Sequence, residues 1–250
     1  LPKELLPING KPGLEYILDE CIDAGITEFI FIISNKKKII KKYFYNDVFF
    51  KKIIKKKNKD LKLLYQYKKI KKYKKMIKFV YQNTPRGTGD AVLKCKKFLK
   101  HDFFLMLLPD DLIIKKNCSK EMINLHKKTK SSVIATKLVN KKTVSRWGIL
   151  SIKNKNKNSF QISDVVEKPT VKEAKSNYAI IGRYILPTNI MQEIINLNPG
   201  KGGEIHITDA IKNLIIKGNN FYANIFQGKH LDCGTLEGYI KSTLEISKYK

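Results

Sequence analysis

Apolar residues along the first half of the chain follow two alternating patterns. In residues 12–24 they fall on one face of a helix, and Gly25 provides a stop directly after it. The next apolar stretch, FIFIIS at 29–34, is continuous, which is typical of a strand covered on both faces. The chain is therefore expected to begin with a helix followed by a buried strand.

This order of strand and helix continues to about residue 137. We expect strands at 77–82, 103–108 and 131–136, and helices at 88–99 and 119–129. Strands that alternate with helices in this way predict a parallel sheet flanked by helices.

After residue 138 the pattern changes to short strands separated by turns. We expect strand segments at 148–152, 160–168, 177–186, 221–227 and 230–234, and helices near 188–197, 207–217 and 234–247. The sequence shows no internal repeat and no linker long enough to divide the chain. Its 250 residues suit one large α/β domain.

Residues 36–78 are dominated by lysine. This segment contains 19 lysines and only two acidic residues, Asp47 and Asp60. Apolar residues recur through it, so it is not a disordered run of charge. We expect two or three surface helices whose polar faces carry the lysines.

The charge of the whole chain raises the question of nucleic acid. Lys and Arg number 50 against 22 Asp and Glu, a formal net charge of +28. However, only three of these residues are arginines (Arg86, Arg146 and Arg183), and arginine is the residue that favours bidentate recognition of phosphates and bases. We therefore expect no nucleic-acid partner. Retention of RNA at about 0.2 M salt would support that competing class of function.

The four cysteines and the hydrophobic runs indicate the compartment. Cys21, Cys95, Cys118 and Cys233 form no C-x-x-C pair and no metal-ligand spacing, which indicates reduced thiols in a cytoplasmic protein. No apolar run approaches the roughly 20 residues that span a bilayer, so we expect no membrane partner.

One motif, FFLMLLPDD at 103–111, ends an apolar run in two carboxylates. The polar end could be an ordinary turn, or it could deliver a metal-binding carboxylate to an active site. Ligands of open α/β sheets bind beyond the carboxyl ends of the strands, which favours the second interpretation.

Seven segments together resemble one family. In order they are LPKELLPINGKPGLEYILDECIDAGITEFIFI, QNTPRGTGDAVL, LLPDD, VVEKP, SNYAIIGRYIL, PGKGGEIHITDAI and HLDCGTLEGYIKSTLE. The chain is similar to the bacterial UTP–glucose-1-phosphate uridylyltransferases (UDP-glucose pyrophosphorylases) over nearly its whole length, most weakly across 36–78. The resemblance implies a Rossmann-like three-layer α/β/α sandwich with a mixed, mostly parallel central sheet. It also implies the Mg²⁺-dependent synthesis of UDP-glucose and pyrophosphate from UTP and glucose 1-phosphate.

The resemblance assigns the metal and catalytic residues. Asp110 of LLPDD would bind Mg²⁺ and Asp232 of LDCG would complete the site, which suits an ion that takes one or two carboxylates beside phosphate oxygens. Lys168 of VVEKP would meet the sugar phosphate, and Glu167 would accept hydrogen bonds from the sugar. Asp110 and Lys168 are thus the expected catalytic residues. A polar turn for Asp110 and a charge at a helix start for Asp232 remain the alternatives.

The resemblance also assigns binding residues. Lys3 would reach the nucleotide phosphates, and Gln82 and Gly87 would meet the uracil base. Gly148 and Gly182 would let backbone lie close to the sugar, with ordinary turn or bulge glycines as the alternative. The chain departs from the family pattern at three positions, which are Asp90 (usually His), Asp111 (usually apolar) and Trp147 (usually Tyr). We interpret Asp111 as a turn residue or as a partner that supports the metal-binding residues.

The remaining expectations concern organisation. Residues 1–137 would bind the nucleotide, and 138–250 would bind the sugar phosphate and supply the C-terminal helix. In the family a strand and a glycine-rich loop precede the P-K-E segment, and we expect both to be missing before Leu1. A homo-oligomer, dimer or tetramer, is expected by analogy. The alternatives are a glucose-1-phosphate thymidylyltransferase and a non-catalytic relative that binds sugar nucleotide.

Overall fold

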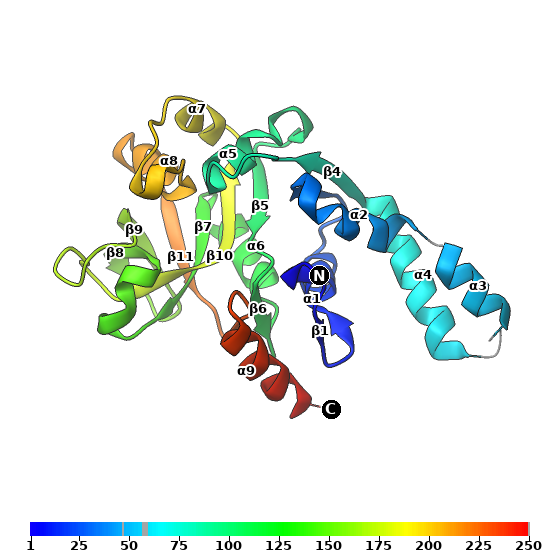
Figure 1. Ribbon diagram of the computed structural model, residues 1–250. Coiled ribbons are helices and arrows are strands. Elements are labelled where there is room, and N and C mark those ends of the chain that lie inside the picture. The colour runs from blue at the N-terminus through cyan, green and yellow to red at the C-terminus, as the bar shows by residue number, and fades with distance from the viewer. Residues whose placement is uncertain (47, 57–59, 250) are drawn as a thin grey trace.

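The structure is a computed structural model that describes residues 1–46, 48–56 and 60–249 (Figure 1). Its α-helices are α1 (Gly13–Asp23), α2 (Lys38–Tyr45), α3 (Val48–Lys56), α4 (Leu61–Met76), α5 (Thr88–Leu93), α6 (Cys118–Thr129), α7 (Ile190–Ile195), α8 (Ile207–Ile216) and α9 (Leu236–Ser247). Its strands are β1 (Pro7–Ile8), β2 (Lys11–Pro12), β3 (Phe29–Ile33), β4 (Ile77–Tyr81), β5 (Phe103–Leu107), β6 (Asp111–Ile114), β7 (Ser132–Leu138), β8 (Gly148–Lys155), β9 (Ser159–Glu167), β10 (Tyr178–Pro187), β11 (Phe221–Ile225) and β12 (Lys229–Asp232).

Helix α1 shows how closely local sequence fixes an element. It ends at Asp23, and Gly25 follows in the left-handed region at φ +94°, a conformation that glycine adopts without strain. The predicted helix at 12–24 and its stop are confirmed. By contrast, the helix expected at 88–99 is shorter, because α5 ends at Leu93 and a separate 3₁₀ turn covers Lys96–Phe98.

The central sheet has six strands in the order β5-β10-β7-β11-β9-β8. Only β7 and β11 pair in parallel, and the other neighbours pair antiparallel. The mixed α/β sheet is confirmed, but the expectation that it is mostly parallel is wrong for these neighbours. The reason is that β10, from the second half of the chain, inserts between β5 and β7 of the first half in the opposite direction.

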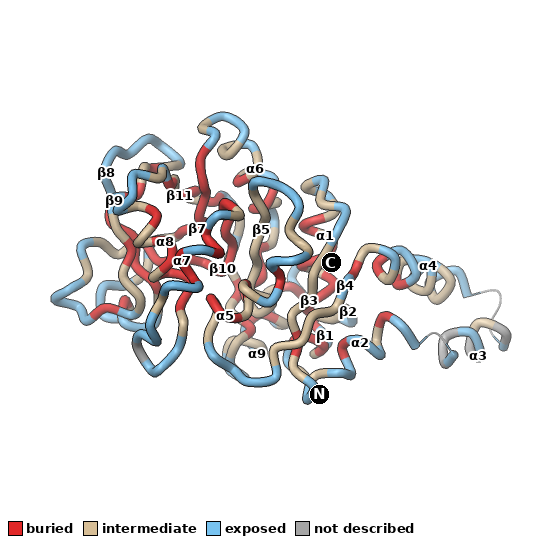
Figure 2. The backbone as a smooth tube through the Cα atoms, turned by 90° about the horizontal axis from the view of Figure 1, so that it is seen from above, coloured by how far each residue is buried: buried red, intermediate tan, exposed pale blue. Residues whose placement is uncertain are grey.

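Helices cover both faces of this sheet. Ile181 and Ile185 of β10 pack toward Met122 of α6 on one face. Tyr184 and Leu186 of the same strand belong to the core beneath α7 and α8 on the other face. Because neighbouring side chains of a strand point to opposite faces, one continuous apolar strand serves both layers. Figure 2 shows the buried residues concentrated along these central strands, and the three-layer sandwich is confirmed.

The lysine-rich segment forms α2, α3 and α4, as expected. Ile40 and Phe44 of α2 pack on Ile70 and Tyr73 of α4, while α3 and α4 project away from the sheet (Figures 1 and 2). Asp60 caps α4 by accepting a hydrogen bond from the Leu63 amide at 2.9 Å. The other acidic residue of this segment, Asp47, lies outside the described residues.

The strand expected at 103–108 is β5, which lies at an edge of the six-stranded sheet. Within residues 1–46, 48–56 and 60–249, β5 pairs only with β10, and β3 pairs only with β4. All five residues of β5, and all of β3 except Ile33, are only half-buried. Phe29 and Leu107, one from each strand, pack against the same core cluster around Ile17. We propose that a further strand pairs with these two apolar edges.

This proposal predicts a gain in stability. A protein extended before Leu1 by about 20–25 residues, the length of one strand and a loop, should pair the open edges. We expect its melting temperature to rise by about 5–10 °C, which corresponds to about 2–3 kcal/mol of added stability at roughly 2–4 °C per kcal/mol in a domain of this size. Calorimetry of the two forms measures the difference, and equal melting temperatures would contradict the proposal.

All four cysteines are free and buried. Burial raises the pKa of the Cys21 thiol to about 12, which keeps it protonated. Of the helices in the described ranges, none combines the length and the apolar character that crossing a bilayer requires.

Candidate active site

The two predicted metal-binding aspartates lie side by side, Asp110 in a turn and Asp232 at the end of a strand. Asp110 follows β5, and Asp232 is the last residue of β12. Strands β6 and β12 pair antiparallel with Asp232 opposite Asp111, and the Cys233 amide donates to the Asp110 carbonyl oxygen at 2.8 Å. Positions more than 100 residues apart in sequence therefore meet at one point.

A glycine leaves room for both carboxylates. A Cβ on Gly234 would lie 3.0 Å from Asp232 Oδ1 and 3.2 Å from Asp110 Oδ2. The Gly234 amide also donates to Asp232 Oδ1 at 2.8 Å, which orients that carboxylate. The two carboxylates thus converge beside Gly234, as a shared cation site requires.

Lys3 lies against this pair. Its Nζ donates to Asp110 Oδ2 at 2.6 Å. Burial lowers the pKa of Lys3, but the hydrogen bond to Asp110 and the charges of Asp110, Glu4 and Asp232 outweigh it, so the net pKa is raised. Lys3, which is predicted to bind the nucleotide, therefore lies beside the two carboxylates.

The donor set fits Mg²⁺ rather than a transition metal. Among the described residues, no group of three or more His, Cys, Asp and Glu side chains gathers around a possible ion. Mg²⁺ takes one or two carboxylates and completes its octahedron with water and phosphate oxygens. Asp110 and Asp232 supply such a pair, and the metal is expected to require a bound phosphate.

The predicted sugar-phosphate residues lie at the end of β9. Lys168 has a φ of +44°, a left-handed conformation that is uncommon for a residue with a side chain and that concentrates at functional sites. Its amide donates to the Trp147 carbonyl oxygen at 3.0 Å. Glu167 accepts from Thr208 Oγ1 at 2.9 Å, and its Oε1 lies 3.9 Å from Lys168 Nζ. The half-exposed ammonium of Lys168 is thus held in a defined turn.

Trp147 connects this turn to β12, the strand that ends at Asp232. Its ring lies 6.1 Å from the His230 ring of β12, centroid to centroid, and 5.4 Å from the ammonium of Lys137. The next residue, Gly148, pairs with Glu167, and a Cβ there would come within 3.3 Å of Glu167 Oε2. Trp147 therefore contacts the Lys168 turn through its carbonyl oxygen and β12, the strand that ends at Asp232, through its ring.

Gly182 has close neighbours of its own. A Cβ on it would lie 2.5 Å from both Asp111 Oδ2 and the Leu108 Cβ, so only glycine fits. Glycine is required here because the backbone of β10 lies close to the LLPDD turn. A contact between Gly182 and the sugar remains a prediction.

The predicted base-binding residues form a second group. Gln82 Nε2 donates to Asp90 Oδ2 at 2.8 Å and to the Gly87 carbonyl at 3.2 Å. Gly87 has a φ of +101°, and a Cβ on it would meet the Ile205 backbone at 2.5 Å. In the described chain, hydrogen bonds and ion pairs do not join Gln82 or Gly87 to the Asp110 carboxylate.

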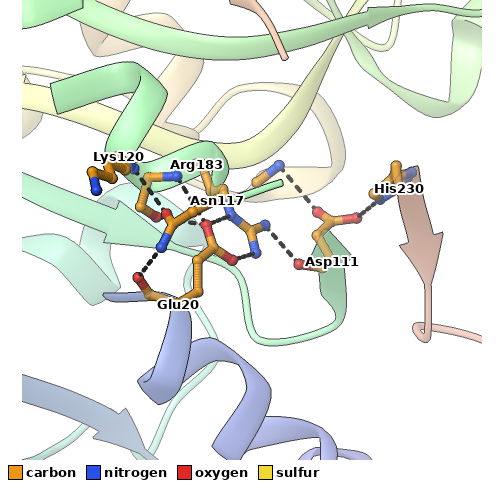
Figure 3. A network of polar contacts seen from close by, with 8 residues as sticks. Glu20, Asp111, Asn117, Lys120, Arg183 and His230 are labelled. Carbon is orange, nitrogen blue, oxygen red and sulfur yellow. Dashed lines mark hydrogen bonds and ion pairs between the residues drawn. The ribbon is translucent and has the colours of Figure 1, made fainter. Parts of the chain in front are cut away.

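A buried polar network beneath the site escaped the sequence analysis (Figure 3). Arg183, fully buried, donates to both carboxylate oxygens of Glu20, at 2.9 and 2.5 Å, and to the Asp111 carbonyl at 2.6 Å. His230, to which no role was assigned, contacts the Asp111 carboxylate. One signal was available, because Arg183 is one of three arginines and interrupts an otherwise apolar strand.

The chain is similar to known proteins along almost its whole length. The family model for nucleotidyl transferases matches residues 1–248. The chain is 35% identical over 249 residues to the UTP–glucose-1-phosphate uridylyltransferase of Mycoplasma genitalium, covering 98% of this chain and 84% of that protein.

Two solved structures are similar along the whole chain. A UDP-glucose pyrophosphorylase complexed with UDP-glucose superposes with a TM-score of 0.86 at 32% identity, covering 100% of this chain and 92% of that one. A UTP-bound UGPase from Acinetobacter baumannii gives a TM-score of 0.88 at 31% identity, with coverage of 100% and 87%. From the family match and these similarities, the chain belongs to the nucleotidyl transferase family.

Proposed function

We propose that the protein makes UDP-glucose and pyrophosphate from UTP and glucose 1-phosphate. The observation that carries the proposal is the convergence of Asp110 and Asp232 beside Gly234, with Lys3 against them. The printed names of the relatives support the choice of substrates. Residues 1–137 would bind UTP, and residues 138–250 would bind the sugar phosphate.

Mg²⁺ would be held by Asp110 and Asp232 and would neutralise negative charge on the phosphates of the nucleotide. Lys168 would bind the phosphate of glucose 1-phosphate through its ammonium, and Glu167 would accept hydrogen bonds from the sugar hydroxyls. Gln82 would donate and accept at the edge of uracil. These residues bind and orient two anionic substrates that otherwise repel each other.

The reaction needs little covalent chemistry from the protein. A phosphate oxygen of glucose 1-phosphate attacks the α-phosphorus of UTP in line, and a new P–O bond forms. The bond between the α-phosphorus and the oxygen that bridges to the β-phosphate breaks, and pyrophosphate leaves with that oxygen. Positioning and charge neutralisation account for the catalysis. Four buried free thiols support an action in the cytoplasm.

The choice of nucleotide provides the test. With Mg²⁺ and glucose 1-phosphate, we expect pyrophosphate release to be at least about tenfold faster from UTP than from dTTP, which carries an extra methyl group on the base and lacks the 2′-hydroxyl of the ribose. A coupled pyrophosphate assay measures both rates. Equal or faster turnover of dTTP would identify a thymidylyltransferase, and binding of UDP-glucose without turnover would identify a non-catalytic relative.

A further inference from the structure

We infer that Asp111 is a positioning residue that fixes the two metal-binding turns relative to each other. The inference rests on the proposed function, because it concerns how Asp110 and Asp232 are held in place. Asp111 does not face Gly234 with them. Its carboxylate points into the protein, toward β10 and β12 (Figure 3).

Both oxygens of the Asp111 carboxylate are engaged by neighbouring strands. Oδ2 accepts from the Gly182 amide of β10 at 3.1 Å. Oδ1 lies 2.6 Å from Nε2 of His230 in β12. Asp111 directly follows Asp110, and His230 lies two residues before Asp232. The carboxylate therefore connects the strand segments that carry the two metal-binding residues, without coordinating the metal itself.

Lys137 determines which ring nitrogen of His230 accepts a hydrogen bond and which one donates. Its Nζ lies 2.5 Å from Nδ1 of His230, whose side chain is only 3% exposed. An ammonium can donate hydrogen bonds but cannot accept them, so Nδ1 acts as the acceptor. The hydrogen on Nε2 is then the one that His230 donates to Asp111. Lys137 orients His230, and His230 in turn orients Asp111.

The main chain of Asp111 is anchored as firmly as its side chain. Arg183 Nη1 donates to the Asp111 carbonyl at 2.6 Å. Glu20 neutralises the guanidinium, and the amide and hydroxyl of Ser119 donate to the same Glu20 carboxylate at 3.0 and 2.6 Å. A buried ion pair whose hydrogen bonds are satisfied resists displacement, because moving it would leave a buried charge unpaired.

The surroundings of Asp111 agree with this role. Donors from β10 and β12 contact both carboxylate oxygens, and the buried guanidinium of Arg183 binds the main chain of the same residue. Loss of a residue that holds metal ligands in position typically lowers metal affinity by about 10–100-fold.

Two variants of His230 separate its two contacts. The amide nitrogen of His230→Gln can replace Nε2 and still donate to Asp111. The shorter side chain of His230→Asn can replace Nδ1, so it keeps Lys137 and loses Asp111. Asp111→Asn tests the carboxylate directly. Thr136→Val is the matched control, because it removes another buried hydrogen bond between β7 and β10, from Thr136 Oγ1 to the Ala179 carbonyl at 2.7 Å.

Two measurements apply to each variant. The first is amide hydrogen exchange of Cys233 without metal or substrate, because this amide joins the two metal-binding turns through the Asp110 carbonyl. The second is the Mg²⁺ concentration that half-saturates pyrophosphate release. In His230→Asn and Asp111→Asn we expect the exchange rate of the Cys233 amide and the half-saturating Mg²⁺ concentration each to rise about tenfold. In His230→Gln both quantities should stay within about threefold of the unmodified protein. In Thr136→Val both should be unchanged.

Equal Cys233 exchange rates and equal Mg²⁺ requirements in His230→Asn and His230→Gln would overturn the inference. So would an unchanged Mg²⁺ requirement in Asp111→Asn. If Cys233 exchange changes as expected but the unmodified protein makes no UDP-glucose, the positioning role is supported and the proposed function fails. The exchange measurement needs neither metal nor turnover, so the two failures are distinguishable.

Discussion

Replacing Lys168 with alanine is expected to lower kcat by about 10²–10³, which corresponds to roughly 3–4 kcal/mol for the loss of one preorganised charge-stabilising group. The side chain is about half exposed (49%) and lies in a turn held by its backbone amide, so the mutation leaves that anchor intact. Alanine at a φ of +44° has the same conformational cost as lysine, because both carry a Cβ. Unfolding free energy should therefore change by less than about 0.5 kcal/mol.

Lys172→Ala is the matched control for this variant. Lys172 is an exposed lysine four residues further along the chain, and its loss removes one positive charge from the same region. If a general positive field attracts the sugar phosphate, both variants should slow the enzyme to a similar extent. More than half of the unmodified turnover in Lys168→Ala would remove Lys168 from the site.

Asp110→Asn is the second change with a large expected effect. Near a protein surface, losing one unit charge beside a divalent cation costs several kcal/mol, and the 27% exposure of this side chain reduces the cost. We expect the Mg²⁺ concentration for half-maximal activity to rise about a hundredfold, or roughly 3 kcal/mol. The fold should remain, since a part-exposed pair with Lys3 contributes only about 0–1 kcal/mol.

Asp164→Asn controls for the loss of an acidic residue elsewhere. Asp164 also lies near lysines, with Lys175 at 3.6 Å and Lys212 at 3.7 Å, but on β9 before the Glu167–Lys168 turn. Its Mg²⁺ requirement should match that of the unmodified protein. An unchanged requirement in Asp110→Asn as well would leave Asp110 as the polar end of a strand and no more.

Local pattern predicted most of the helices and strands, because periodicity and stop residues act over a few positions. The helix at 13–23 and the strand at 29–33 follow directly from their apolar spacing. Strand β6 was missed, since Asp111–Ile114 reads as the continuation of a turn and becomes a strand only by pairing with β12. The edge position of β5 could not be predicted either, because pairing order depends on where β10 returns.

Some residues of the candidate site could likewise be predicted from local motifs, and others could not. Asp110, Asp232 and Lys168 were identified through motifs that resemble those of a family, and contacts place the first two together. The close approach of Asp111 to Gly182, and the contact of Asp111 with His230, were not visible in sequence. These residues are more than 40 positions apart, and their roles exist only once β6, β10 and β12 are assembled. Tertiary contacts, rather than local propensity, define this layer of the site.

The measurement that tests the account most directly is a double-mutant cycle of Asp110→Asn and Asp232→Asn, read out as the Mg²⁺ concentration that half-saturates UDP-glucose formation from UTP and glucose 1-phosphate. If both carboxylates bind one ion, their effects are coupled, and the double variant should differ from the sum of the single effects by about 1–3 kcal/mol. Additive effects within about 0.5 kcal/mol would mean that the two aspartates act independently. That result would contradict a shared metal site beside Gly234.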